Sequence, residues 1–217
     1  MKEKILTNVR IIDPSQNIDE IGDIIIDDRG KIKSVGKSEK NSGTSKSIEK
    51  IDLKGNIAIP GIVDMKAFVG EPGFEYKENF RTLSKAALAG GVTSIVTMPN
   101  TKPIIDNVSM VDFIIRRGRD KSKVNLFPCA SITRQIEGNQ MTEFGLLKAR
   151  GVIGFSDVNK TIQNTELMSR IMNYASDIDV LIMQHAEDYE LSKNSCINEG
   201  EVATRLGLQG VSDIAEK

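Results

Sequence analysis

The sequence is poor in the residues that build metal centres and disulfides, with one histidine and two cysteines among 217 residues. A catalytic zinc site typically takes about three protein ligands, mostly histidine, and His185 alone cannot supply them. Cys129 and Cys196 form no Cys-x-x-Cys pair, so we expect buried, reduced thiols and neither a disulfide nor a nucleophile. A histidine-rich metal centre within these residues is therefore excluded.

The sequence also lacks an excess of charge of one sign and any long apolar run. Its 29 basic and 30 acidic residues leave a net charge of −1, which gives no argument for a nucleic acid or an anionic membrane as partner. No run approaches the roughly 18 apolar residues of a membrane span. The first residues also have no apolar core of signal-peptide length. We therefore predict a cytoplasmic protein with no nucleic-acid or membrane partner.

The first quarter of the chain is predicted to be a small all-β domain over residues 1–56. A further strand is expected at 48–53, after a polar loop at 38–47. Gly30 lies between two apolar runs and can adopt a positive φ, which predicts a hairpin turn there. The other expected strands are residues 4–12, 22–27 and 31–36.

From Ile57 to the last residue the pattern changes to strands alternating with helices. This alternation is typical of a parallel sheet with crossover helices. The expected strands are an apolar run after Pro60-Gly61 and residues 93–98, 124–130, 152–155 and 180–185. The expected helices are residues 75–89, 108–119, 142–149 and 165–175, and one starting near Glu199. An eight-stranded barrel takes about 250 residues, so five units predict either a partial barrel or an open sheet standing alone.

The most organised motif is the stretch D-M-K-A-F-V-G-E-P-G at residues 64–73. It resembles the first barrel strand of the dihydroorotases, in the amidohydrolase superfamily, whose motif is D-x-H-x-H-x-R-E-P-G. The first residue and the closing E-P-G match. The two family histidines that bind a catalytic metal are replaced by Lys66 and Phe68, and the arginine that holds the substrate carboxylate is replaced by Gly70.

Three later positions extend the resemblance. Asn100 lies in M-P-N-T-K-P, close to the family's M-P-N-T-x-P, where the asparagine contacts substrate. Asp157 lies in F-S-D-V-N, similar to F-S-D-D-G, where an aspartate helps to hold the metals. His185 stands where the family has its fifth-strand metal histidine. Alternatively, each is structural: Asn100 caps a proline-framed turn, Asp157 is a turn or N-cap residue, and His185 is a hydrogen-bonded strand end.

The resemblance implies a partial (β/α)8 barrel over residues 57–217, preceded by part of a β-sandwich, as the front half of a longer polypeptide. It implies a dihydroorotase-like protein of pyrimidine biosynthesis. The lost ligands predict a catalytically silent protein that acts as a structural partner of aspartate carbamoyltransferase in a homo- or hetero-oligomer, with no cofactor or weakly bound zinc. The alternatives are an active dihydroorotase or related metal-dependent cyclic amide hydrolase, and a small-molecule binder that uses Asn100 without turnover.

A further expectation concerns the replaced strand residues. Lys66 and Phe68 are two apart, so they share one face of the strand and are expected to point into the barrel mouth. We predict that the Lys66 ammonium pairs with Asp157 in place of a metal. In the alternative, Lys66 extends into solvent.

Overall fold

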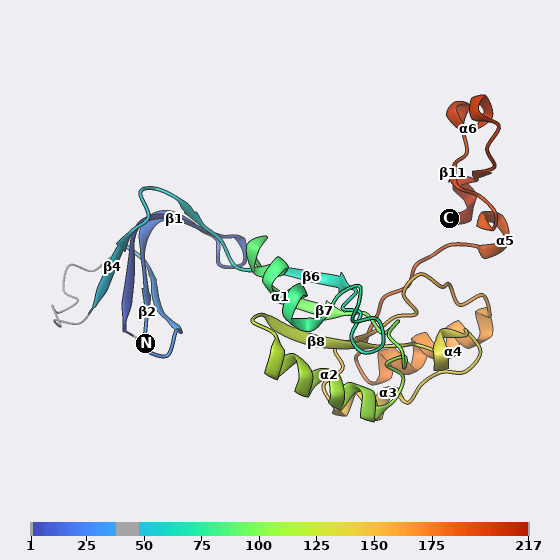
Figure 1. Ribbon diagram of the computed structural model, residues 1–217, viewed down its shortest axis with the longest axis horizontal. Helices are drawn as coiled ribbons and strands as arrows, with labels where there is room; N and C mark the ends of the chain where they lie inside the picture. The colour runs from blue at the N-terminus through green and yellow to red at the C-terminus, as the bar shows by residue number, and fades with distance from the viewer. Residues whose placement is uncertain (1, 38–47, 217) are drawn as a thin grey trace. The chain divides into compact units, whose positions relative to one another are not determined.

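The chain, described by a computed structural model for residues 2–37 and 48–216, forms two compact units, Met1–Gly61 and Ile62–Lys217 (Figure 1). The loop expected at residues 38–47 lies outside the described residues. The predicted domains, 1–56 and 57–217, stay a prediction.

The N-terminal unit is a five-stranded sheet with the order β3-β2-β1-β4, in which β5 also pairs with β1. Neighbours β1–β2 and β2–β3 are antiparallel, whereas β4 and β5 run parallel to β1. Val9, Ile11 and Ile24 form its buried core. The predicted hairpin is confirmed, because Gly30 has a φ of +80° between β2 and β3. The strands are β1 Lys4–Asp13, β2 Ile18–Ile26, β3 Ile32–Gly36, β4 Glu49–Asp52 and β5 Ile57–Ala58, with a 3-10 turn at Pro14–Gln16.

The C-terminal unit is built on a five-stranded parallel sheet whose strands follow chain order, β6 to β10. Helices alternate with the strands, as predicted for an α/β fold (Figure 1). The strands are β6 Ile62–Ala67, β7 Val92–Thr97, β8 Asn125–Ala130, β9 Gly154–Phe155 and β10 Leu181–Ile182. The helices are α1 Phe80–Ala89, α2 Val108–Lys121, α3 Phe144–Ala149 and α4 Thr165–Asp177.

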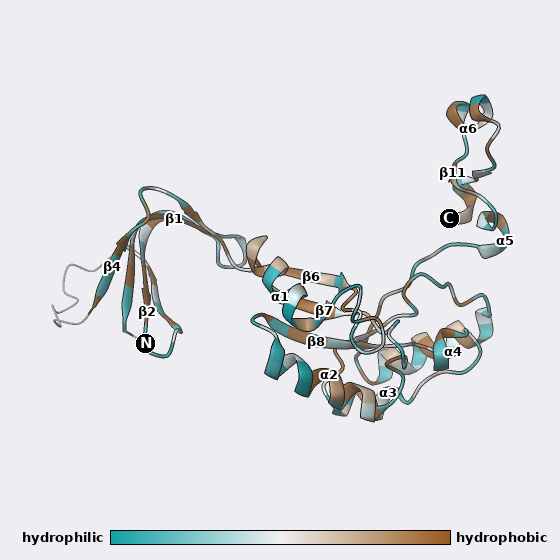
Figure 2. Cartoon of the chain, in the orientation of Figure 1, coloured by the Kyte–Doolittle hydropathy of each residue, from teal (hydrophilic) through white to brown (hydrophobic). Residues whose placement is uncertain are grey.

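The core of this unit lies between the sheet and its helices. Phe80, Ile114, Phe144, Phe155 and Ile171 are fully buried there, and the rings of Phe144 and Phe155 stack with their centroids 4.0 Å apart. Figure 2 shows apolar colouring along much of β7 and β8. Burying a side chain such as Phe155 stabilises the fold by about 1.5–3 kcal/mol, so the β8–β9 region is firmly anchored.

Several predicted element boundaries are wrong; for example, the strand expected at 22–27 is Ile18–Ile26. The first helix begins at Phe80 and not at Glu75, because the Asn79 side chain accepts hydrogen bonds from the main-chain N–H groups of Arg81 and Thr82. Such a cap fixes a helix start. The fifth strand is only Leu181–Ile182, not residues 180–185.

A 3-10 turn at Arg134–Ile136, between β8 and α3, was not predicted. The last part of the chain holds further elements that were not predicted: α5 Tyr189–Ser192, a parallel pair of β11 Ile197–Asn198 and β12 Gly210–Val211, and a 3-10 turn at Asp213–Glu216. The helix expected near Glu199 is α6 Glu201–Leu206. Within the part of the chain that the structure describes, no helix is long and apolar enough to cross a membrane. The cytoplasmic location stays a prediction.

Candidate functional site

The carboxyl ends of the parallel strands open onto a pocket of about 440 Å³. It is lined by Phe74 from the loop after β6 and by three segments that follow β7, β8 and β9: residues 100–104, 135–136 and 157–160. The structure thus brings Asn100 and Asp157 into one pocket. His185 does not line this pocket, although it follows β10, which belongs to the same sheet.

Asp157 is a buried carboxylate whose two oxygens are both occupied. Its Oδ1 accepts the main-chain N–H groups of Ile132 and Thr133, at 2.8 and 3.0 Å, and its Oδ2 accepts the Thr133 hydroxyl. Burial raises the pKa of the Asp157 carboxyl, and these hydrogen bonds together with the charge of Lys160 oppose part of that rise. Asp157 therefore ties the loop after β8 to the loop after β9.

Asn100 follows β7 and presents an unusual acceptor. Its Oδ1 is buried and has no hydrogen-bond partner among the described residues. A buried polar atom without a partner is costly, and this one belongs to a pocket-lining residue. The neighbouring chain is well held, because the Thr101 hydroxyl donates to the Pro103 carbonyl at 2.7 Å. The prediction that Asn100 contacts a substrate stays open.

Lys66 does not pair with Asp157, so that prediction is wrong. The exposed Lys66 Nζ donates to the Asn159 Oδ1 at 3.1 Å and makes no ion pair within the described chain. The physical reason is that Asp157 turns its oxygens toward Ile132 and Thr133. Lys66 and Asn159 both depart from the resembled motifs, and this hydrogen bond connects the two positions.

Phe68 and Gly70 shape the loop after β6 in different ways. The half-buried Phe68 ring lies 6.1 Å from the Phe74 ring, centroid to centroid. Gly70 has a φ of +71°, and a Cβ added there would lie 2.6 Å from the Glu78 carbonyl oxygen and 2.9 Å from that of Phe74. Only glycine fits such a position without a shift of main chain. The arginine of the resembled motif is incompatible with this loop conformation.

Glu71 is the retained acid of the motif and has a structural role here. Its side chain is buried, with Oε2 accepting the Phe80 N–H at 3.2 Å and Oε1 accepting Arg117 Nε at 2.5 Å. Glu71 thereby ties the loop after β6 to the start of α1, through Phe80, and to α2, through Arg117. The sequence carries no local signal for this pair, because its members are 46 residues apart.

His185 makes a local contact and does not join a cluster of ligands. Its Nε2 lies 2.8 Å from Glu187 Oε2, and its carbonyl oxygen accepts the Thr161 hydroxyl at 2.6 Å. Hydrogen bonds from Ser192 and then from His185 lower the pKa of Glu187.

The side chains near the strand ends do not make a metal site. No three or more His, Cys, Asp or Glu side chains of the described residues come together in a way that could hold a metal ion. The residues present therefore do not fit the metal centre that the resemblance implies.

Comparison with solved structures identifies the fold. The L-hydantoinase (dihydropyrimidinase) from Arthrobacter aurescens matches with a TM-score of 0.73 and 20% identity, over 88% of this chain and 42% of that one. The D-hydantoinase from Bacillus sp. AR9 matches with a TM-score of 0.69 and 18% identity, over 94% and 43%. The parallel sheet is therefore part of the (β/α) barrel found in amidohydrolases, which confirms the predicted fold class.

Comparison of sequences then identifies the family. The profile described as dihydro-orotase-like matches residues 55–217. A protein named dihydroorotase from Syntrophus aciditrophicus is 42% identical over 98% of this chain and 49% of its own length. Another from Geobacter metallireducens is 43% identical over 95% and 48%. The chain belongs to the dihydro-orotase-like family, and it spans about half the length of these relatives.

Proposed function

We propose that this protein is a catalytically silent dihydroorotase-like member of pyrimidine biosynthesis, acting as a structural partner of aspartate carbamoyltransferase. One observation carries the proposal. At the positions of the family's first-strand metal and substrate residues, the chain has a lysine bonded to Asn159, a phenylalanine packed near Phe74, and a glycine whose conformation excludes a side chain.

The chemistry of the reaction explains why these replacements matter. Opening a cyclic amide needs an activated water and a polarised carbonyl group, which metals supply in this class of enzyme. A general base within the pocket would be the remaining route. Asp157 is poorly suited to that role, because the N–H and O–H donors of Ile132 and Thr133 occupy its oxygens. The described residues thus support binding better than turnover.

A second candidate is an active dihydroorotase or a related cyclic amide hydrolase. It is favoured by the name dihydroorotase carried by relatives more than 40% identical. In that case His185 would be a ligand and Asn100 a substrate contact, completed by residues beyond those present here.

Metal content and turnover decide between the two candidates. We expect the purified protein to carry substoichiometric zinc by elemental analysis, and to convert neither dihydroorotate nor carbamoyl aspartate after zinc is added. About two tightly bound metals per chain, or turnover that disappears in His185→Ala, would overturn catalytic silence. Cys196→Ser, at an exposed cysteine, is the matched control.

The partner role is tested separately. It is supported by the family resemblance alone, so it is the weaker half of the proposal. We expect the protein to co-purify with aspartate carbamoyltransferase from the same cells, and the two to elute together in size-exclusion chromatography. Separate elution at micromolar concentrations of both proteins would contradict the role and leave catalytic silence untouched.

A further inference from the structure

A second cavity, of about 440 Å³, lies between α1, α2 and the loop after β6. It shares no lining residue with the pocket at the strand ends. Its lining is polar throughout and includes three cations and two acids: Arg81, Arg117, Lys121, Glu71 and Glu75. Because no apolar side chain forms a wall, the cavity suits a small charged molecule and not an apolar ring.

The three cations keep unused hydrogen-bond donors. The side chains of Arg81 and Lys121 make no hydrogen bond or ion pair with other described residues. Arg117 donates from Nε to Glu71 Oε1 at 2.5 Å, which leaves the four N–H donors of its two Nη groups. The cavity thus offers two guanidinium groups and one ammonium group to a ligand.

The cations are placed where a helix dipole or another cation repels them. Arg81 lies in the first turn of α1, which contains no acidic residue, and the helix dipole disfavours a cation there. The dipole of α2 favours Lys121 in its last turn, but Arg117 lies four residues before Lys121, a spacing at which like charges repel. Residues 116–123 hold five basic residues and one acid, and Figure 2 shows the hydrophilic colouring of this end of α2. An anion bound in the cavity would relieve both repulsions.

The two acids of the lining differ in their surroundings. Glu71 is buried, and its two oxygens accept the Phe80 N–H and Arg117 Nε. Glu75 is exposed and accepts the Gly73 N–H through Oε1 at 3.0 Å. This hydrogen bond is the largest cause that lowers the pKa of Glu75 from the ordinary 4.5. Glu75 is therefore a carboxylate above that pH, and its Oε2 can accept a further hydrogen bond.

The acids do not cancel the cations. Glu75 and Asp120 both act on Arg117, and Asp120 also lies 3.5 Å from Arg119. The two segments that border the cavity, residues 71–85 and 112–123, together contain eight basic and five acidic residues. The whole chain, in contrast, has a net charge of −1. The surplus of positive charge is thus local to this part of the chain, and it attracts anions.

We propose that Arg81, Arg117 and Lys121 bind the phosphate group of a small polar molecule, and that Glu75 accepts the P–O–H hydrogen of that group. Guanidinium groups bind phosphate oxygens through paired, charge-assisted hydrogen bonds. A phosphate monoester has a second pKa of about 6, so it keeps one acidic hydrogen below that pH. A sulfate ester has no such hydrogen, and the Glu75 carboxylate repels it. The inference goes beyond the proposed function and holds whether or not that function does, since it needs neither turnover nor a protein partner.

Three matched probes separate charge from hydrogen bonding. At a pH of about 5.5, methyl phosphate is mostly a monoanion with one P–O–H group. Methyl sulfate is a monoanion without such a group, and trimethyl phosphate is uncharged. In titrations of the protein followed by NMR, we expect methyl phosphate to bind about 10-fold more tightly than methyl sulfate. We expect trimethyl phosphate not to bind at millimolar concentration.

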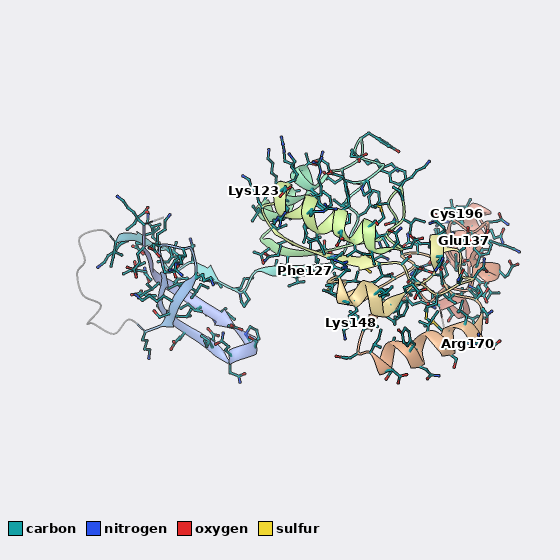
Figure 3. All side chains as sticks on the ribbon, turned by 90° about the horizontal axis from the view of Figure 1, so that it is seen from below. Lys123, Phe127, Glu137, Lys148, Arg170 and Cys196 are labelled. Carbon is teal, nitrogen blue, oxygen red and sulfur yellow. The ribbon has the colours of Figure 1, made fainter. Side chains whose placement is uncertain are left out.

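Variants assign the effect to the named residues. Arg81→Met and Lys121→Met are each expected to weaken methyl phosphate binding about 5- to 10-fold. Both variants should stay folded, because neither side chain has a hydrogen-bond partner among the described residues. Glu75→Gln should bring the affinities for methyl phosphate and methyl sulfate within about 2-fold of each other. The control is Arg170→Met, which removes an exposed guanidinium of α4 that lies on the opposite side of the C-terminal unit from Lys123 (Figure 3).

The outcomes are decisive in either direction. Equal affinities for methyl phosphate and methyl sulfate in the wild-type protein would overturn the proposal, and so would no binding of methyl phosphate at millimolar concentration. A loss in Arg170→Met as large as in Arg81→Met would also overturn it. Zinc content, turnover and co-purification do not enter these measurements, so failure here leaves the proposed function standing.

Discussion

The ends of β9 and β6 reach the same edge of the sheet but differ in how firmly they are built. Phe155, Ser156 and Asp157 at the end of β9 are buried, and the carboxylate accepts three hydrogen bonds from the neighbouring loop. Along β6, every residue except Ala67 is exposed, and Lys66 has one side-chain hydrogen bond. The contrast separates a packed side of the site from a weakly restrained one.

This difference in burial and hydrogen bonding indicates which residues of the site can be replaced without loss of the fold. Substitutions on an exposed strand cost little stability, whereas those in a packed, hydrogen-bonded loop cost several kcal/mol. Lys66 on β6 and Phe68 just after it, the two departures here, lie where few contacts depend on them. Glu71, by contrast, is buried in the following loop and pairs with Arg117.

The largest effect is expected from Phe155→Ala. The ring is fully buried and stacks on Phe144, so its removal should cost about 3–5 kcal/mol of unfolding free energy in urea titrations. The comparison variant is Phe68→Ala at the β6 end, where the half-buried ring should cost about 1 kcal/mol. Similar losses in the two variants would refute the contrast.

Asp157→Ala should cost about 3 kcal/mol, because it leaves two main-chain N–H groups and the Thr133 hydroxyl without their acceptor. Asp157→Asn keeps one carbonyl oxygen and should cost less.

The pH dependence of the unfolding free energy tests Asp157 in a second way. Because the carboxyl pKa is raised in the folded state from the ordinary 3.8, its contribution to stability is present at low pH and declines as the pH rises above that value. The stability gap between wild type and Asp157→Asn should therefore shift with pH in urea titrations, and a constant gap would contradict a raised pKa.

Glu71→Ala should cost about 2 kcal/mol, since it removes the acceptor of the buried Phe80 N–H at the start of α1. Arg117→Met keeps that acceptor but leaves the carboxylate without its cation, so it should also destabilise, although the guanidinium is half exposed. Circular dichroism during urea unfolding measures both. If Glu71→Ala were neutral, the retained acid would have no structural role in this loop.

The smallest effect is expected for Lys66→Met, at under about 1 kcal/mol, because an exposed hydrogen bond contributes little. Asn159→Ala, which removes the acceptor, should have an effect of similar size. The double variant should show a coupling energy of a few tenths of a kcal/mol in a double-mutant cycle. A coupling well above 1 kcal/mol would mean that the β6 end is more strongly restrained than its exposure indicates.

The sequence predicted the order of strands and helices because apolar periodicity reports local burial. It placed the start of α1 wrongly because Asn79, and not the apolar pattern, fixes that start. It paired Lys66 with Asp157 because both side chains were expected to face the barrel mouth, across which opposite charges attract. The choice of Asn159 depends on how Asp157 is oriented by main-chain donors 24 and 25 residues away. Such long-range donors leave no periodic signal, and neither does the Glu71–Arg117 pair.

The conformation of Gly70 restricts which residues position 70 can take. With a φ of +71° and carbonyl oxygens where a Cβ would lie, the loop has no room for the arginine of the resembled motif. Placing histidines at positions 66 and 68 would be two replacements, one on exposed β6 and one at a half-buried residue just after it. Restoring the arginine first requires that residues 70–78 be rebuilt. A single substitution of Gly70 by arginine is therefore blocked by the main chain around it, whatever residues stand at positions 66 and 68.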